Sequence, residues 1–296
     1  MSFEMPADFN YPSKTIEVLG ANMHYVEHGE GDPILFIHGQ PTWSYLWRDV
    51  MPEVEGCGRL IAVDLIGYGR SDKPAIDYEM TDHIRYLEQF IEALGLDNIT
   101  LVIHDWGSFF GFHYAMQHPE KIKGIAFMEA VLFPIPGYDA FEPGVREFFE
   151  TLRASQENAE NMMVDQNLFI EGVLPGAIKR TLSAAEHDAY RAPWTNPEDR
   201  KILCKFPQNL CIGGQPANIN AMQMAYMEKL QSSRVPKLML HATPGLLNPP
   251  EVVEWCAANL PECETVHVGD GLHYIQEDCP QAIGQAIKSW MTKLGA

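Results

Sequence analysis

The fold of this chain is decided by the stretch Ile99-Thr-Leu-Val-Ile-His-Asp105-Trp-Gly-Ser108-Phe-Phe-Gly111. It starts with an apolar, β-branched run, which is typical of a buried strand. The chain then changes direction near Asp105 and continues in a helical pattern through Phe112 and Met116. The pattern therefore predicts a strand, a sharp turn and a helix, with Asp105 at the tip of the turn.

The residue type at the tip limits the chemistry. In the esterase version of this turn, G-x-S-x-G, a serine stands where this chain has Asp105. A carboxylate is a poor acylating nucleophile, because it leaves readily from the anhydride that it would form. Toward a saturated carbon with a leaving group it works well, because the product is a stable ester. Asp105 thus favours alkyl transfer over peptidase or lipase chemistry; alternatively, it only caps a helix that starts near Ser108.

Length and composition indicate one α/β core with an insertion. The chain has 296 residues, 46% of them hydrophobic, and no apolar run long enough to span a membrane. Its net charge of −19 argues against nucleic acid and anionic membranes as partners and favours a neutral substrate. The acidic start lacks the features of a signal peptide, and the six cysteines show no C-x-x-C spacing. We therefore expect a cytoplasmic protein with reduced thiols.

Strand patterns alternate with helix patterns over most of the chain, which predicts a mostly parallel sheet with helices on both faces. Residues 133–215 differ, because they hold seven prolines between short amphipathic helix patterns and no convincing strand. We expect a core of residues 1–132 and 216–296 with a helical cap of residues 133–215 inserted after the sixth strand. The expected strands are 15–18, 23–27, 33–38, 59–63, 122–128, 237–241 and 264–268, and the strand, turn and helix around Asp105 are expected over 99–118. The other expected core helices are about 80–94, capped by Thr81 or Asp82, about 250–260 and 280–294.

Polar residues follow several of these strands, at the edge where parallel sheets place their sites. They are Gln40, Asp105, Trp106, Glu129 and His273. The order nucleophile, acid, histidine is that of α/β-hydrolases. The loop after strand 237–241, a usual position for the acid, has no carboxylate at residues 242–248, so Glu129 is the candidate acid. Taken singly, Glu129 could be a surface residue and His273 an ordinary loop residue.

Several motifs together resemble the haloalkane dehalogenases, in the subfamily whose catalytic acid is a glutamate. The similarity runs from about residue 12 to the C-terminus and includes the cap. It is carried by His38-Gly-Gln-Pro-Thr-Trp-Ser-Tyr-Leu-Trp-Arg48, Asp64-Leu-Ile-Gly-Tyr-Gly-Arg-Ser-Asp72, His104-Asp-Trp-Gly-Ser108, Met128-Glu-Ala130, Val173-Leu-Pro-Gly176 and His273-Tyr-Ile-Gln-Glu-Asp278. The resemblance implies an α/β-hydrolase fold with an eight-stranded sheet.

It also implies a mechanism. Asp105 attacks the halogen-bearing carbon and releases halide, and His273, oriented by Glu129, activates the water that hydrolyses the alkyl ester. The backbone N–H groups of Gln40 and Trp106 form the oxyanion hole, and the indole N–H of Trp106 binds the halide. Most of this subfamily have asparagine where this chain has Gln40. We expect its side-chain amide to bind halide as well; the alternative is a solvated loop residue that uses only its backbone N–H.

The substrate pocket is expected between sheet and cap, with Ala177 bordering an open entrance. A small halogenated aliphatic compound, halide and water are the expected partners, without metal or cofactor; the oligomeric state is not predicted. Two other hypotheses remain. An epoxide hydrolase needs paired cap tyrosines; Tyr138 and Tyr190 are present, but the sequence around neither matches. The other hypothesis is a luciferase-like cofactor-independent monooxygenase. The expected pocket walls are Phe133, Phe148, Phe149, Leu152, Phe169, Val173, Ala177, Pro207, Leu246, Leu247 and Ile275.

Overall fold

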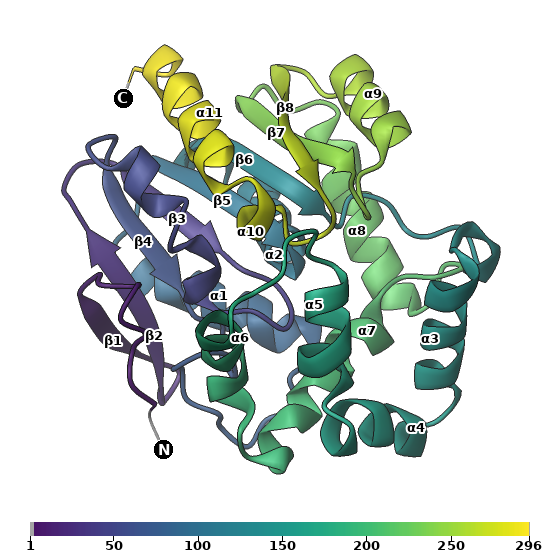
Figure 1. The fold of residues 1–296 in the computed structure, drawn as a ribbon. Coiled ribbons are helices and arrows are strands. Elements are labelled where there is room, and N and C mark those ends of the chain that lie inside the picture. Colours follow the sequence, from purple (N-terminus) through teal and green to yellow (C-terminus); the bar gives the residue numbers. More distant parts are fainter. Residues whose placement is uncertain (1–2, 296) are drawn as a thin grey trace.

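Eight strands form a single sheet at the centre of the computed structural model, which describes residues 3–295 (Figure 1). The spatial order is β1-β2-β4-β3-β5-β6-β7-β8. Only β2 runs antiparallel to its neighbours, so the prediction of a mostly parallel eight-stranded sheet is confirmed. The strands are β1 Ser13–Val18, β2 Ala21–His28, β3 Pro33–Ile37, β4 Arg59–Val63, β5 Ile99–Asp105, β6 Ile122–Ala130, β7 Lys237–Pro244 and β8 Cys263–Gly271.

The central strands lie in the core. Every residue of β3 and β5 is buried, which explains why both read as unbroken apolar runs rather than alternating patterns. The edge strand β1 is mostly exposed and alternates only at its end. Because β3, β5 and β6 are adjacent and parallel, their carboxyl ends bring Gln40, Asp105 and Glu129 to the same edge of the sheet.

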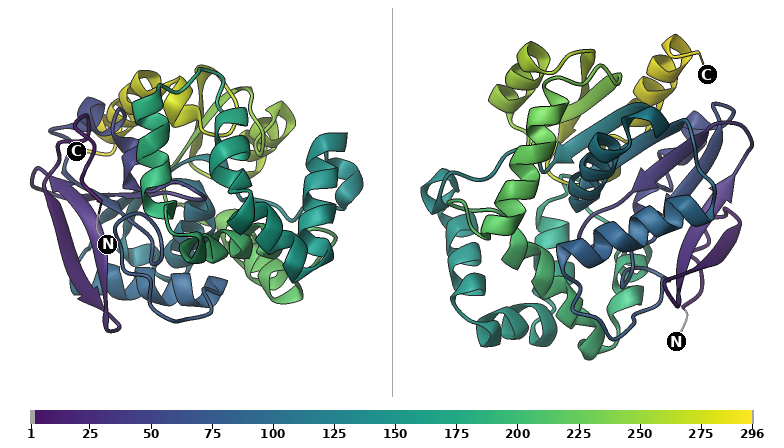
Figure 2. Two further views of the ribbon diagram at one scale, coloured as in Figure 1. Left: turned by 60° about the horizontal axis from the view of Figure 1, so that its bottom comes forward. Right: turned by 180° about the vertical axis from the view of Figure 1, so that it is seen from behind.

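Helices cover both faces of the sheet. On one face, α1 (Met80–Ala93), α2 (Trp106–Gln117), α8 (Ala217–Leu230) and α9 (Pro250–Asn259) share one hydrophobic cluster. On the other face, α10 (Ile275–Asp278) and α11 (Pro280–Lys293) share a second cluster with the short 3₁₀ turns Ser44–Trp47 and Met51–Val54. Figure 2 shows α1, α2 and α8 from behind, crossing the first face.

The helix starts differ in detail from the sequence-based expectation. Helix α1 is capped by Glu79, not by Thr81 or Asp82, because the helix already begins at Met80. Asp82 still contributes as the third helical residue, since its carboxylate accepts the Glu79 N–H at 3.1 Å. Helix α2 begins at Trp106 rather than near Ser108. Helix α8 had no counterpart among the expected elements.

Between β6 and α8 the chain forms short helices that gather along one side of the molecule, with α3 and α4 at the outer edge (Figure 1). We propose that residues 133–215 form the cap, with residues 1–132 and 216–296 as the core. Two short π-helical turns, Asn161–Asp165 and Phe169–Val173, and the 3₁₀ turn Pro197–Cys204 join the cap helices. Those helices are α3 Pro143–Ala154, α4 Gln156–Glu160, α5 Leu174–Gly176, α6 Ala184–Arg191 and α7 Lys205–Asn209.

Within residues 3–295, no helix is both long and apolar enough to cross a membrane. The same residues contain no cluster of three or more His, Cys, Asp and Glu side chains that could hold a metal ion. All six cysteines are free thiols.

Candidate active site

Asp105 lies at a strained turn between β5 and α2. Its φ of 50° and ψ of −129° are rare for a residue with a side chain. Such strain persists where the surroundings enforce it, commonly at functional sites. The Asp105 carboxylate makes no capping hydrogen bond to α2, so the alternative of a simple helix cap is wrong. The turn instead holds the carboxylate at the carboxyl edge of the sheet, with 7% of the residue exposed.

Two glycines leave room for this turn. A Cβ on Gly39 would lie 2.1 Å from Asp105 Oδ1, and a Cβ on Gly107 would lie 2.2 Å from the Ile37 carbonyl oxygen. Both distances are too short for any side chain. The loop after β3 can therefore approach the Asp105 carboxylate only because residue 39 lacks a side chain.

Each Asp105 oxygen has its own partner. The backbone N–H of Gln40 donates to Oδ1 at 2.7 Å, and Oδ2 lies 3.3 Å from His273 Nε2. Burial alone would raise the pKa of Asp105. The hydrogen bond and charge of His273 outweigh burial, with help from the Trp106 backbone N–H, and lower the pKa. The carboxylate is therefore ionised and able to act as a nucleophile.

Glu129 is a fully buried carboxylate at the end of β6. Its Oε2 lies 3.2 Å from His273 Nδ1. Three backbone N–H groups also donate to it: those of Leu246 at 3.1 Å, Leu247 at 2.7 Å and Asn248 at 3.4 Å. The loop that has no carboxylate of its own thus supplies the donors that satisfy this buried charge. Glu129 is not a surface residue.

His273 is held from its backbone as well as from its ring. Its N–H donates to the Ala177 carbonyl at 3.0 Å, and its carbonyl accepts from His104 Nε2 at 2.9 Å. Burial alone would lower the pKa of His273, but the hydrogen bonds and charges of Asp105 and Glu129 raise it to about 9. His104, whose pKa burial and the neighbouring His273 lower to about 3, is neutral. The imidazole of His273 is therefore fixed between two carboxylates.

An apolar cavity of about 420 Å³ adjoins Asp105 and extends under the cap. Eight of the expected wall residues line it: Phe148, Phe149, Phe169, Val173, Ala177, Pro207, Leu246 and Leu247. Sequence reasoning missed further lining residues: Val131, Ala140, Phe141, Glu142, Gly144, Val145, Leu210 and Tyr274. Five of these residues, at positions 140–142, 144 and 145, lie in the irregular segment before α3 or in its first turn. The sequence there has no periodic pattern of apolar residues that would mark them as lining a pocket.

The other three expected wall residues lie elsewhere. Phe133 packs edge-on against Trp255 on α9, with ring centroids 4.7 Å apart. Leu152 is fully buried in the hydrophobic cluster of the first face. Ile275 is fully buried in the opposite cluster. These residues do not line the cavity, because their side chains point into the packed layers.

Trp106 and Gln40 both line the cavity. The Trp106 ring packs against Phe206 with centroids 5.1 Å apart, and its indole N–H has no hydrogen-bond partner within residues 3–295. Gln40 is 3% exposed, so it is not a solvated loop residue. Its Nε2 donates to the Leu203 carbonyl, and its Oε1 accepts from the Tyr68 hydroxyl, both at 2.8 Å. The second N–H of the Gln40 amide has no hydrogen-bond partner within the described residues.

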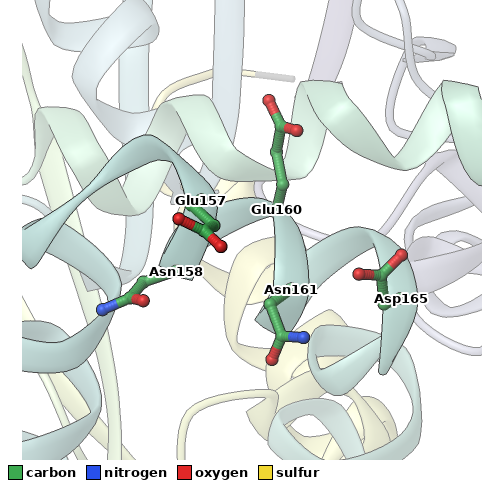
Figure 3. Close-up of a pocket in the computed structure, with 5 residues that line it drawn as sticks. All are labelled: Glu157, Asn158, Glu160, Asn161 and Asp165. Atoms are coloured by element: carbon green, nitrogen blue, oxygen red, sulfur yellow. The ribbon is translucent and has the colours of Figure 1, made fainter.

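A second cavity, of about 430 Å³, lies within the cap and has only polar walls: Glu157, Asn158, Glu160, Asn161 and Asp165. Figure 3 shows these side chains pointing in different directions rather than toward a common point. None of them lines the cavity beside Asp105.

Comparison with known proteins places this geometry in a family. Residues 32–280 match the family model for the alpha/beta hydrolase fold. A haloalkane dehalogenase of Mesorhizobium japonicum is 42% identical over 282 residues, covering 94% of this chain and 91% of its own. One of Sphingobium indicum is 43% identical over 289 residues, covering 95% of both chains. The chain belongs to the haloalkane dehalogenase family.

Solved structures of haloalkane dehalogenases agree with the computed fold. DbeA from Bradyrhizobium elkani superposes with a TM-score of 0.94 at 39% identity, covering 97% of this chain and 99% of its own. DatA from Agrobacterium tumefaciens superposes with a TM-score of 0.91 at 34% identity, covering 96% and 97%. The similarity thus includes the cap as well as the sheet.

The tyrosines that an epoxide hydrolase would need do not face the cavity. Tyr190 is fully buried and its hydroxyl donates to Glu277. Tyr138 is absent from the lining residues of the Asp105 cavity. The tyrosine that does line it, Tyr274, donates its hydroxyl to the Gln40 carbonyl at 2.9 Å. This arrangement favours the haloalkane dehalogenase chemistry of the family.

Proposed function

We propose that this protein hydrolyses haloalkanes to an alcohol, a halide ion and a proton, with Asp105 as nucleophile. One observation carries the proposal. Oδ1 of Asp105 is held by the Gln40 N–H, while Oδ2 lies beside His273 at the inner end of an apolar cavity. An ionised carboxylate fixed in this way meets the needs of displacement at saturated carbon.

In the first step, Oδ2 of Asp105 attacks the carbon that carries the halogen. A carbon–oxygen bond forms, and the carbon–halogen bond breaks with its electron pair leaving on the halide. The indole N–H of Trp106 and the remaining amide N–H of Gln40 stabilise the charge that develops on the halide. The mostly apolar walls favour a small neutral aliphatic substrate.

In the second step, His273 takes a proton from water, and the resulting hydroxide attacks the ester carbonyl of Asp105. The backbone N–H groups of Gln40 and Trp106 stabilise the oxyanion, a contribution worth roughly 10²–10³ in rate for one donor. Glu129 stabilises the imidazolium, much as the aspartate of a hydrolase triad does. Collapse of the intermediate releases the alcohol and restores the carboxylate, and the proton that His273 took from water passes to solvent.

The timing of proton transfer follows from the same electrostatics. In the free enzyme, the charge of Asp105 helps to keep the pKa of His273 near 9. Once Asp105 is esterified, that charge is gone, and the pKa of His273 falls. His273 therefore becomes a base when a base is required.

The test uses His273→Phe, which keeps an aromatic ring but has no base. Incubation with 1-bromobutane should release one equivalent of bromide and leave a butyl group on the peptide that contains Asp105, as detected by mass spectrometry. The matched control is His267→Phe, since His267 lies outside the cavity. It should turn over without accumulating an adduct. No adduct, or an adduct on another residue, would refute the mechanism.

The other two readings have their own tests. Opening of an epoxide at a rate comparable to bromoalkane hydrolysis would indicate an epoxide hydrolase. Light emission with coelenterazine would indicate a luciferase-like monooxygenase. We expect neither with this enzyme, and bromide and acid release from simple bromoalkanes should depend on Asp105.

A further inference from the structure

The side-chain amide of Gln40 joins the core to the cap. We propose that Tyr68 is a positioning residue for the halide site, because its hydroxyl fixes the Gln40 amide in the orientation that binds halide. The inference rests on the proposed function, in which Gln40 is the second halide donor. Tyr68 comes from the loop after β4, and Leu203, on the other side of the amide, comes from the 3₁₀ turn Pro197–Cys204 of the cap.

The partners leave one orientation for the amide. The Leu203 carbonyl can only accept a hydrogen bond, so the Nε2 end of Gln40 must face it. Oε1 then faces Tyr68, whose hydroxyl must donate. Without that hydroxyl, the buried carbonyl oxygen of Gln40 would lose its hydrogen-bond partner. The second N–H of Nε2 has no hydrogen-bond partner among the described residues, and Gln40 lines the cavity beside Asp105, where a ligand can accept from this N–H.

Tyr68 itself is held rigidly. Its ring is fully buried, stacks on Phe206 at 5.3 Å and meets Trp194 edge-on at 5.3 Å. The flanking residues Gly67 and Gly69 have φ of +84° and +52°. A Cβ at 67 would lie 2.5 Å from Tyr78, and one at 69 would lie 2.3 Å from the Asp64 carboxylate. The backbone can present Tyr68 in this way only with glycine on both sides.

The hydroxyl is also a reliable donor. Burial raises the pKa of Tyr68 well above its usual range, and the charge of Asp105 adds to the effect. Tyr68 therefore stays protonated at any pH at which the enzyme works. Its orientation of Gln40 does not vary with pH.

One cap residue contacts both Trp106 and Tyr68, the residue that positions Gln40. Phe206, from α7 in the cap, contacts both Tyr68 and Trp106, with ring centroids 5.3 Å and 5.1 Å away. The halide site is thus assembled across the boundary of core and cap. Glutamine, longer than asparagine by one methylene, has the reach to contact the cap at Leu203 while its backbone N–H stays on Asp105.

The test is a double-mutant cycle with Tyr68→Phe and Gln40→Ala, using bromide as the probe. Bromide affinity is measured by quenching of tryptophan fluorescence. Tyr68→Phe should weaken it about 3- to 10-fold, the range expected for one hydrogen bond. In the Gln40→Ala background, removal of the hydroxyl should change nothing further. The matched control is Tyr45→Phe, which removes another buried tyrosine's hydroxyl, bonded to Asp8 at 2.8 Å, and should leave bromide affinity unchanged.

Kinetics separate positioning from a general structural effect. With 1-bromobutane, Tyr68→Phe should slow ester formation but not ester hydrolysis, because the halide donors act only in the first step. Circular dichroism and thermal unfolding check the fold. A second variant, Tyr68→Met, lacks the hydroxyl but fills the space with a flexible apolar chain, and should reproduce the weakened bromide binding.

The outcomes are distinguishable. If Gln40→Ala weakens bromide binding and Tyr68→Phe does not, Gln40 is a halide donor but the role of Tyr68 is refuted. Equal losses from Tyr68→Phe in both backgrounds would also refute it, since Tyr68 would then act without Gln40. If Gln40→Ala has no effect, the second halide donor and the role of Tyr68 fail together. Failure of the proposed function itself would appear separately, as absence of bromide release by the unmodified enzyme.

Discussion

The charge of Asp105 should control the basicity of His273. The imidazole lies between two carboxylates, with Nε2 at 3.3 Å from Asp105 and Nδ1 at 3.2 Å from Glu129. Against the effect of burial, these carboxylates raise the pKa of His273 from 6.5 to about 9. Replacing Asp105 with asparagine removes one charge and keeps the shape, as esterification would. We therefore predict that the pKa of His273 falls in Asp105→Asn.

The magnitude follows from the geometry. The net rise in the pKa of His273, from 6.5 to about 9, corresponds to about 3 kcal/mol. Because the two carboxylates lie at nearly equal distances from the ring, we assign a comparable share of this rise to each of them. The pKa of His273 should then fall by at least about 1 in the variant.

The assay is an NMR titration of the protein with labelled histidines. The signal of His273 is assigned by its loss in His273→Gln, and mass spectrometry verifies that residue 105 remains asparagine. The matched control is Asp188→Asn, which removes a carboxylate that is 69% exposed on α6 and should leave the pKa of His273 unchanged. If the pKa of His273 in Asp105→Asn stays near that of the wild type, the charge of Asp105 does not govern the base.

Stability gives an independent check with a definite sign. The pKa of His273 is raised in the folded protein, so its stabilising contribution is complete below about pH 6.5 and is lost as pH rises through about 9. The free energy of unfolding of the wild type should therefore decline, relative to that of Asp105→Asn, over this pH range. Denaturant titrations at several pH values measure the free energy of unfolding of both proteins. A difference between the two proteins that does not change with pH would contradict this link between the pKa of His273 and stability.

Two further predictions concern the support of the nucleophile and the base. Glu129→Gln should fold, because the amide oxygen can still accept the Leu246 and Leu247 N–H groups. Loss of the charge should slow ester hydrolysis by about 10²-fold or more. Stopped-flow kinetics should show the alkyl-enzyme accumulating, and an unchanged kcat would contradict the role of Glu129 as the acid. Gly39→Ala should abolish bromide release, because its Cβ would lie 2.1 Å from Asp105 Oδ1, whereas Gly137→Ala, with no atom within 4 Å of the new Cβ, should retain activity.

Much of the core could be predicted because its signals are local. Buried parallel strands are continuous apolar runs, and the turn at Asp105 joins a strand pattern to a helix pattern within a few residues. The chain order of Asp105, Glu129 and His273 places them at one edge of the sheet once the strands are parallel. The helix start at Glu79 was missed, because either of two neighbouring polar residues could have served as the cap.

The amino-acid sequence by itself determined the type of fold and the family, because short segments of the chain carry the signals for both, and it predicted Asp105 as the nucleophile. Only the tertiary structure decided which apolar side chains face the cavity: Phe148 lines it and Phe133 packs on Trp255, although both are apolar residues near the cap. It also decided the partners of Gln40, since Tyr68 and Leu203 lie 28 and 163 residues away in the chain. Such contacts depend on how segments far apart in the chain pack together, and the sequence pattern around a single residue does not indicate which distant segment it will contact.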